Sequence, residues 1–341
     1  LASRMIDEAA ATRRSLFTQI RDRRSRLSNS DFSVVRGRVF LRDTHALETR
    51  PALAWHLFLF LARHNLRLAV ATEKRIAKAL PLIEKQARSG ERIWPVLAET
   101  LKRRHAYRAL SAMRETGALL ALFPEYEKVD CLVIRDFYHR YTVDEHMFRA
   151  IGVLRGLEDD EDEFTQRFSR LLPEISNPEY IYFALLFHDA GKGLPGGDHS
   201  ANSLVMADRA MERIGMEPAG RDTVRFLIRH HLTMSNFMRT RNLSEPGTRQ
   251  QLAEWTGTTG RLKALTLVTL ADISAVHPSA MTPWRKELLW QLYVATYNEL
   301  TRQAGEVRIE AGQMDRYLTR AGSDQERGEL TQFLEGFPRR Y

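Results

Sequence analysis

Apolar residues recur at three- and four-residue spacing through most of the chain between residues 51 and 303. This period is typical of one face of an α-helix, and from residue 130 onward no pair of alternating strands competes with it. Helices are predicted over 51–65, 71–87, 94–103, 106–122, 143–157, 178–190, 200–214, 219–233, 246–256, 260–276 and 283–303. The fold class is therefore predicted to be all-α.

Two stretches near the start of this pattern need a separate interpretation. The run at 32–41, FSVVRGRVFL, alternates and is β-branched around Gly37, which predicts a small hairpin or an extended segment. The most apolar run, PALAWHLFLFLA, is shorter than the roughly 20 residues that a membrane-spanning helix needs. It also contains His56. We interpret it as a buried helix and expect no membrane partner.

Three parts are predicted along the chain. Residues 1–127 form a basic helical linker domain, which begins with an Arg-rich surface helix and is punctuated by Pro81, Gly90, Pro95 and Pro124. Residues 128–303 form a larger helical bundle, and residues 304–341 form a helical tail. The first residues, LASRMIDEAA, lack an initiating Met and a signal-peptide core, so we expect a piece of a longer protein.

Charge and cysteine content narrow the class of partner. The chain carries a net charge of +8, but residues 1–127 hold 24 basic and 13 acidic residues, so the basic excess lies there. This third lacks the interleaved aromatic residues of a base-stacking surface, which ranks RNA binding last and makes a nucleic-acid partner a weak hypothesis. Cys131 is the single cysteine, which excludes an intrachain disulfide and fits a reducing cytoplasm.

Histidines and aspartates in or just after the predicted helices are the residues able to carry chemistry. Imidazole and carboxylate ligands suit divalent transition metals, manganese and magnesium, whereas the lack of thiolates argues against a structural zinc site. The order His, His-Asp, Asp, with separations of 42 and 83 residues, favours a metal site over coincidence. The candidates are His146, His188, Asp189, His199, His230, His231 and Asp272.

The His188–Asp189 pair ends a buried apolar run, IYFALLF, and is followed by Gly191, where we expect the helix to break. Adjacent helical residues point about 100° apart, so the pair can share one ion or bridge two. Asp272 follows another apolar helix and needs a cationic neighbour, because a buried unpaired carboxylate is costly. Alternatively, His146 is a hydrogen-bonded core residue and Asp272 pairs with Arg229 or Lys263.

Together these motifs resemble the HD-domain metal-dependent phosphohydrolase superfamily. YHRYTVDEH, LLFHDAGKG, GGDHS, HHLTMS and TLADISAV look like the uridylyl-removing domain of the bacterial bifunctional PII uridylyltransferase/uridylyl-removing enzymes. The resemblance covers roughly residues 30 to 341. It implies an HD-domain helical bundle after a helical linker, with a nucleotidyltransferase domain expected before residue 1 and ACT domains expected after Tyr341.

The resemblance implies a role for each candidate. His146, His188, Asp189 and Asp272 match the defining metal ligands, while His199 and His231 stand where dinuclear members place further histidines. Of the adjacent pair His231 is preferred, because it directly precedes Leu-x-Met-Ser. The site is expected to hold one or two divalent ions, manganese or magnesium first, with iron or zinc as alternatives.

The implied reaction is hydrolysis of the phosphodiester between UMP and a tyrosine of uridylylated PII protein. Lys192 is expected to contact phosphate or to be a solvated cation at a helix end. Asp189 and Asp198 complete the catalytic set, with Asp198 either orienting a ligand imidazole or being a simple surface carboxylate. Asp144 and Glu145 would orient ligand imidazoles or be surface carboxylates. The sequence leaves the oligomeric state open.

Two other functions remain open at this stage. One is another HD phosphohydrolase activity, on nucleotides, guanosine tetraphosphate or cyclic dinucleotides, since the superfamily shares its ligands across all of these. The other is a non-catalytic regulatory module with a structural metal, against which the intact ligand set counts.

Overall fold

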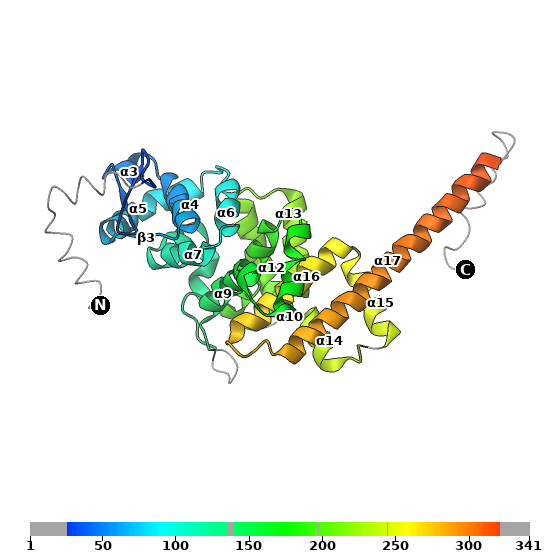
Figure 1. The fold of residues 1–341 in the computed structure, drawn as a ribbon. Helices are drawn as coiled ribbons and strands as arrows, with labels where there is room; N and C mark the ends of the chain where they lie inside the picture. Colours follow the sequence, from blue (N-terminus) through cyan, green and yellow to red (C-terminus); the bar gives the residue numbers. More distant parts are fainter. Residues whose placement is uncertain (1–25, 135–139, 197, 244, 321–341) are drawn as a thin grey trace.

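A computed structural model describes residues 26–134, 140–196, 198–243 and 245–320, and for residues 303–320 it gives the helical backbone alone. The predicted Arg-rich helix before residue 30 lies almost entirely outside these residues, as does the tail beyond residue 320. The described chain consists mainly of helices (Figure 1). The all-α prediction is confirmed, and the domain boundaries at 127 and 303 stay predictions.

A small sheet stands at the start of the described chain. Its strands, in sheet order, are β1 (Phe32–Val35), β2 (Arg38–Leu41) and β3 (Arg67–Leu68). β1 and β2 form the predicted hairpin, and the turn residues Arg36 and Gly37 have φ angles of 51° and 74°. Positive φ at both positions matches the twist of a two-residue hairpin. β3 runs parallel to β2 and was not predicted, because two residues carry no periodic signal.

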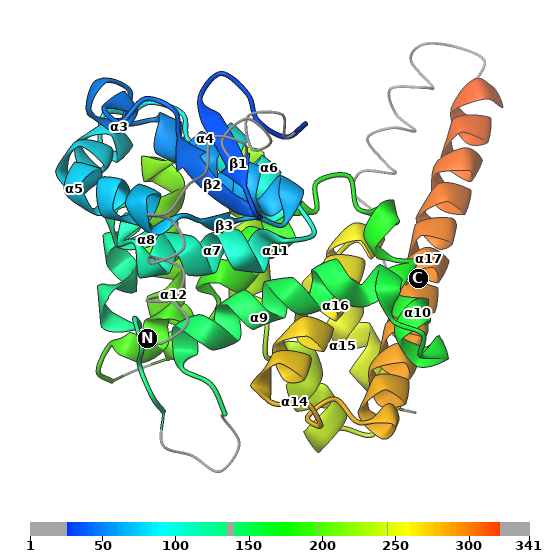
Figure 2. The same ribbon diagram turned by 60° about the vertical axis from the view of Figure 1, so that its left-hand side comes forward.

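The first group of helices packs beside this sheet (Figure 2). The helices are α3 (Ala46–Thr49), α4 (Leu53–His64), α5 (Val70–Ala87), α6 (Trp94–Leu101), α7 (Ala106–Glu115) and α8 (Ala118–Leu122). The predicted helix 106–122 is in fact two helices, because Gly117 adopts a φ of 80° between α7 and α8. Pro81 does not interrupt α5, which runs through it. α4 is the predicted buried helix, with Leu57 and Leu61 fully buried.

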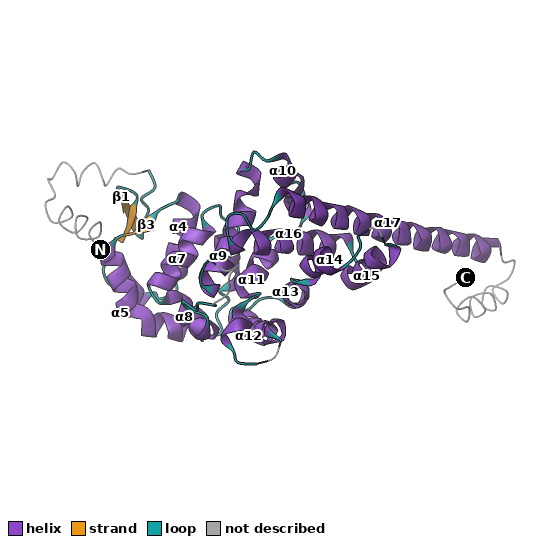
Figure 3. Cartoon of the chain, turned by 90° about the horizontal axis from the view of Figure 1, so that it is seen from below, coloured by secondary structure: helices purple, strands orange, loops and turns teal. Residues whose placement is uncertain are grey.

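The second group forms the larger bundle. Its α-helices are α9 (Val143–Gly156), α10 (Glu163–Ser169), α11 (Glu179–Phe187), α12 (His199–Arg213), α13 (Pro218–His230), α14 (Thr233–Thr240), α15 (Pro246–Thr256), α16 (Thr259–Val276) and α17 (Pro283–Arg320). Short 3-10 turns are η1 (Pro124–Lys128), η2 (Leu157–Asp159), η3 (Leu172–Glu174) and η4 (Ala190–Gly193). α17 continues past the other helices as a long straight rod (Figure 3).

The two groups share one apolar core. α11 lies at its centre with residues 180–187 all buried, packed against α6, α9, α13 and α16. Phe123 and Tyr126, from the end of the first group, pack edge-to-face against Phe183 and Phe187 of α11 at ring-centre distances of 5.2 to 6.1 Å. Aromatic burial of this kind fixes the linker helices against the bundle.

Among the described residues, no helix combines the length and the apolar content needed to cross a bilayer. α4, which holds most of the apolar run PALAWHLFLFLA singled out in the sequence, has 12 residues.

Candidate metal centre

Four candidate ligands converge at the centre of the bundle. His146 comes from α9, His188 and Asp189 follow α11, and Asp272 lies on α16. The His146 Nε2 atom lies 3.2 Å from His188 Nε2 and 3.0 Å from Asp272 Oδ1. Asp189 Oδ2 completes the group at 3.6 Å from His146 Nε2 and 3.5 Å from His188 Nε2. Residues separated by up to 126 positions therefore present their ligand atoms to one point.

A second group of candidate ligands lies beside the first. The Nε2 atoms of His199 and His231 lie 3.6 Å and 3.8 Å from Asp189 Oδ1. Asp189 thus turns one carboxylate oxygen toward each group. The sequence allowed this residue either to share one ion or to bridge two, and the geometry matches the bridging arrangement.

The helix ends explain how the two central imidazoles are aimed. His188 and His231 each directly follow the last residue of a helix, α11 and α13 respectively. Each uses its Nδ1 atom to contact the backbone carbonyl three residues earlier: His188 to Leu185 at 2.9 Å, and His231 to Ile228 at 2.7 Å. A proton on Nδ1 leaves the Nε2 lone pair facing the centre, which is how metal-binding histidines are usually oriented. Sequence analysis missed these two carbonyls, although the three-residue offset from each histidine would have indicated them.

Glycine lets the turn after Asp189 lie close to α12. A Cβ atom on Gly191 would fall 2.1 Å from the carbonyl oxygen of His199. The Gly191 amide donates a hydrogen bond to Ser203 Oγ at 2.8 Å. α11 ends at Phe187, earlier than the expected break at Gly191, so the role of this glycine is close packing rather than helix termination.

The two buried carboxyl groups of the centre, Asp189 and Asp272, have lowered pKa values, although burial alone would raise them. Burial raises the pKa of Asp189, but the charges of His188 and Lys192 hold it below its ordinary value. Burial likewise opposes ionisation of Asp272, yet hydrogen bonds from His146 and His188 hold its pKa well below the ordinary range. Both carboxylates are therefore ionised, as a metal ligand must be.

The pKa values of the His188 and His231 imidazoles are shifted in opposite directions. Burial lowers the pKa of His188, but Asp189 and Asp272 more than compensate and raise it. For His231, burial and then the charge of His188 lower the pKa. His231 is accordingly neutral near pH 7, the state in which imidazole binds metals.

Lys192 and Asp198, the other two predicted catalytic residues, lie at the edge of the centre. Lys192 Nζ is 2.5 Å from Asp189 Oδ2. Asp198 caps α12 by accepting a hydrogen bond from the Ser200 amide at 2.8 Å. This contact, a backbone hydrogen bond to the charged form, lowers the pKa of Asp198. Catalytic roles for both residues stay predictions.

Other sequence candidates lie away from the cluster. The ring of His230 packs against Phe226 and Trp255 instead of entering the cluster. Lys263 pairs with Glu174 at 2.5 Å, so it is not the partner of Asp272.

Asp144 and Glu145 hold α9 to the linker rather than reaching the ligands. Asp144 is fully buried and accepts a hydrogen bond from Arg114 at 2.6 Å. Glu145 accepts one from the Tyr107 hydroxyl at 2.7 Å. Their burial and partners come from α7, which no local pattern could predict.

The chemistry of the donor set fits a divalent cation. Two ligands about 2.1 Å from one ion lie about 3 Å apart or slightly more, close to the separations in the first group. Within the described residues, the Nε2 atoms of His199 and His231 are buried and have no hydrogen-bond partner. Buried imidazole nitrogens of this kind are costly unless something binds them. The residues present therefore fit one ion in the first group and a second beside it.

Comparison with known proteins agrees with this geometry. Residues 143–274 match the family model described as HD domain. The chain is 33% identical over 279 residues to a bifunctional uridylyltransferase/uridylyl-removing enzyme of Caulobacter vibrioides strain NA1000 / CB15N, covering 81% of this chain and 30% of that protein. A protein of the same name from Phenylobacterium zucineum strain HLK1 is 32% identical over 308 residues, covering 89% of this chain and 32% of the relative.

The chain spans about a third of the length of these curated relatives. Among solved structures, the Thermotoga maritima CCA-adding enzyme complexed with tRNA is similar with a TM-score of 0.46 and 14% identity, over 77% of this chain and 52% of that one. No functional conclusion rests on that structural likeness.

Proposed function

Since the chain carries an HD domain over residues 143–274 and is similar to uridylyl-removing enzymes, we propose that it is a metal-dependent phosphodiester hydrolase acting on uridylylated PII protein. The observation that carries the proposal is the convergence of His146, His188, Asp189 and Asp272, which offer four ligand atoms close together inside the bundle. A reducing bacterial cytoplasm is the location that this substrate and the single cysteine favour.

His146, His188, Asp189 and Asp272 would hold one divalent ion, and Asp189, His199 and His231 a second. A bound divalent ion supplies a water of lowered pKa and neutralises charge on phosphate oxygens. Manganese and magnesium suit the mixed imidazole and carboxylate set best, with iron and zinc as alternatives.

The protein's own groups orient the substrate and manage charge. His188 and His231 are fixed by the carbonyls of Leu185 and Ile228, so the ligand geometry is set before substrate arrives. Lys192, 20% exposed at the edge of the centre, offers a cation to a phosphate oxygen of the substrate.

In the proposed reaction a water oxygen bonds to phosphorus and its proton passes to solvent, while the bond between phosphorus and the tyrosine oxygen breaks. Tyrosine leaves as phenolate, because its pKa of about 10 makes it a good leaving group, and a solvent proton then neutralises it. A general acid is therefore not needed for departure, which matches a centre whose two carboxylates are both ionised.

The test joins metal analysis with a substrate panel. The purified chain is expected to contain bound divalent metal and to release UMP from uridylylated PII, with loss of both properties in His188→Ala. His64→Ala, on α4 outside the cluster, is the matched control and should behave as wild type. Turnover that persists in His188→Ala with metal present would contradict the site.

The choice of substrate is tested separately. Guanosine tetraphosphate, cyclic dinucleotides and bis(p-nitrophenyl) phosphate are assayed beside uridylylated PII at equal concentration. Preference for one of the nucleotides, with no release of UMP from the protein, would overturn the PII proposal while leaving a hydrolase in place.

A further inference from the structure

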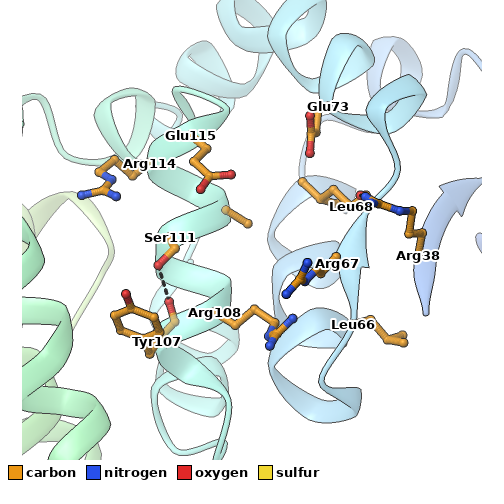
Figure 4. Close-up of a pocket in the computed structure, with 11 residues that line it drawn as sticks. Arg38, Leu66, Arg67, Leu68, Glu73, Tyr107, Arg108, Ser111, Arg114 and Glu115 are labelled. Atoms are coloured by element: carbon orange, nitrogen blue, oxygen red, sulfur yellow. Dashed lines mark hydrogen bonds between the residues drawn. The ribbon is translucent and has the colours of Figure 1, made fainter. Parts of the chain in front are cut away.

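A second concave site lies in the linker part of the molecule, away from the metal centre. Its cavity of about 440 Å³ lies between β3 and α7 (Figure 4). None of the candidate metal ligands lines it. The volume is within the range of pockets that bind small molecules, about 300 to 1,000 Å³.

The lining is dominated by arginine. Arg38, Arg67, Arg108 and Arg114 line the cavity, against Glu73 and Glu115. Two of the four have evident structural partners: Arg38 donates to the Leu68 carbonyl at 3.2 Å, and Arg114 donates to Asp144 at 2.6 Å. The other two arginines, Arg67 and Arg108, contribute positive charge to the cavity that these structural contacts do not explain.

Arg67 and Arg108 approach each other across the gap from two different elements. Arg67 extends from β3 and Arg108 from α7, and their guanidinium groups point into the same space (Figure 4). Within the described part of the chain, neither guanidinium makes a hydrogen bond or an ion pair with another residue. Two cations held in this way repel each other unless an anion lies between them.

The remaining surface of the cavity has a mixed character. Leu66 and Leu68 are buried and form an apolar wall beside the arginines. Ser111 on the opposite wall is already engaged, its hydroxyl donating to the Tyr107 carbonyl at 2.9 Å. A ligand with one strongly anionic end and one flat, less polar end matches this division.

We propose that this cavity binds a small phosphorylated anion of nucleoside monophosphate size, with the phosphate between Arg67 and Arg108. The guanidinium fork matches phosphate oxygens in two-point contacts, and a phosphate dianion balances both charges. The nucleoside part would lie along Leu66 and Leu68. This proposal is independent of the reaction assigned to the metal centre.

Side-chain hydrogen bonds also connect the wall of the cavity to the helix that carries His146. Tyr107 and Arg114, which line it, reach from α7 to Glu145 and Asp144 on α9. These carboxylates immediately precede His146. A ligand in the cavity would therefore lie against α7 side chains that are bonded to α9, the helix that carries His146.

Binding is tested by calorimetry on the whole chain, with AMP, inorganic phosphate and adenosine as probes. One AMP is expected to bind per chain, with inorganic phosphate weaker and adenosine undetectable. His188→Ala should bind AMP as the wild type does, which separates this site from the metal centre. Absence of saturable AMP and phosphate binding at millimolar concentration would overturn the proposal.

Three arginine variants locate the bound probe. Arg67→Ala and Arg108→Ala should each weaken AMP binding at least tenfold, as expected for loss of a charge-assisted contact. Arg108→Lys should lose part of the affinity, because the charge remains while the fork is lost. Arg75→Ala, on α5 outside the cavity, is the matched control and should bind normally. Equal weakening in Arg75→Ala, or unchanged binding in the other two alanine variants, would refute the assignment.

Discussion

The linker helices and the bundle differ in what they bury. In residues 26–129, the buried polar side chains are three threonines, and each hydroxyl donates to a backbone carbonyl: Thr72 to Val39, Thr100 to Val96 and Thr116 to Ala112. The bundle buries hydroxyl side chains too, but among its described residues it also buries the ionisable groups Asp144, His146, His188, Asp189, His231 and Glu299. Burying ionisable groups costs free energy that burying paired hydroxyls does not. The linker therefore buries its polar groups at little cost, whereas the bundle carries the cost of burying ionisable groups, most of which belong to the candidate metal centre.

The strongest test of this difference removes a ligand from the bundle. His188→Ala should lower the rate of phosphodiester hydrolysis on the order of a thousandfold, equivalent to about 4 kcal/mol in the barrier. It should also abolish the rise in melting temperature that added manganese gives the wild type, because only a folded, intact site binds the ion. Activity assays and thermal melts with and without manganese provide both readouts. A melting rise that survives the substitution would break the comparison.

A linker substitution should have the opposite signature. Leu61 on α4 is fully buried, so Leu61→Ala should cost about 2 to 5 kcal/mol of unfolding free energy through a lost contact and a cavity. Manganese affinity in the protein that remains folded should be unchanged. Denaturant titration and metal titration measure the two quantities, with the exposed Leu82→Ala as control. A large change in metal affinity would show that the two parts are not separable in this way.

A substitution at the edge of the candidate metal centre tests whether activity can be lost without a loss of stability. Lys192→Ala removes the cation 2.5 Å from Asp189 Oδ2 and should lower activity or metal affinity about 10- to 100-fold. Unfolding free energy should change little, since Lys192 is partly exposed. Lys286→Ala, whose amine pairs with Asp162 instead, is the control and should retain full activity. Equal losses in the two variants would argue against a role for Lys192.

The smallest expected effect compares two helix caps. Asp198→Ala should lower the unfolding free energy slightly, as loss of a helix cap usually does. It should also weaken metal binding, because His199 is the next residue. Asp162→Ala removes the cap of α10 and should cost a similar amount of stability with no effect on metal. Denaturant midpoints and manganese titrations separate the two outcomes. Unchanged metal binding in Asp198→Ala would contradict a link between this cap and the centre.

Sequence periodicity predicted most helices because it reports burial along one face. The predicted helix 143–157 corresponds to α9 (Val143–Gly156), since its apolar spacing is uninterrupted. The periodicity did not separate α7 from α8. Gly117 ends the helical backbone there through its positive φ angle and lies close to Leu80 of α5, and a contact between two elements leaves no periodic signal in the sequence. β3 was not predicted for a related reason, because its two residues form a strand only by pairing with β2, which is distant in the sequence.

The candidate site shows the same division between local and distant information. The residue types and their order indicated which histidines and aspartates to consider. The sequence did not predict which contacts each residue makes. Asp189 faces both groups of candidate ligands, and Asp144 pairs with Arg114 instead of a candidate ligand. Both arrangements depend on how helices from the two parts of the chain pack together.

The turn after Asp189 limits how the chain can be shortened. A Cβ atom on Gly193 would lie 2.5 Å from the carbonyl oxygen of Lys128, and the Tyr126 hydroxyl donates to the Leu186 carbonyl. A truncated protein that starts at residue 143, where the family match begins, would lose both supports directly behind the candidate metal ligands. A shortened protein should therefore retain the chain from Ala118 or earlier, so that α8 and η1 still pack against the turn.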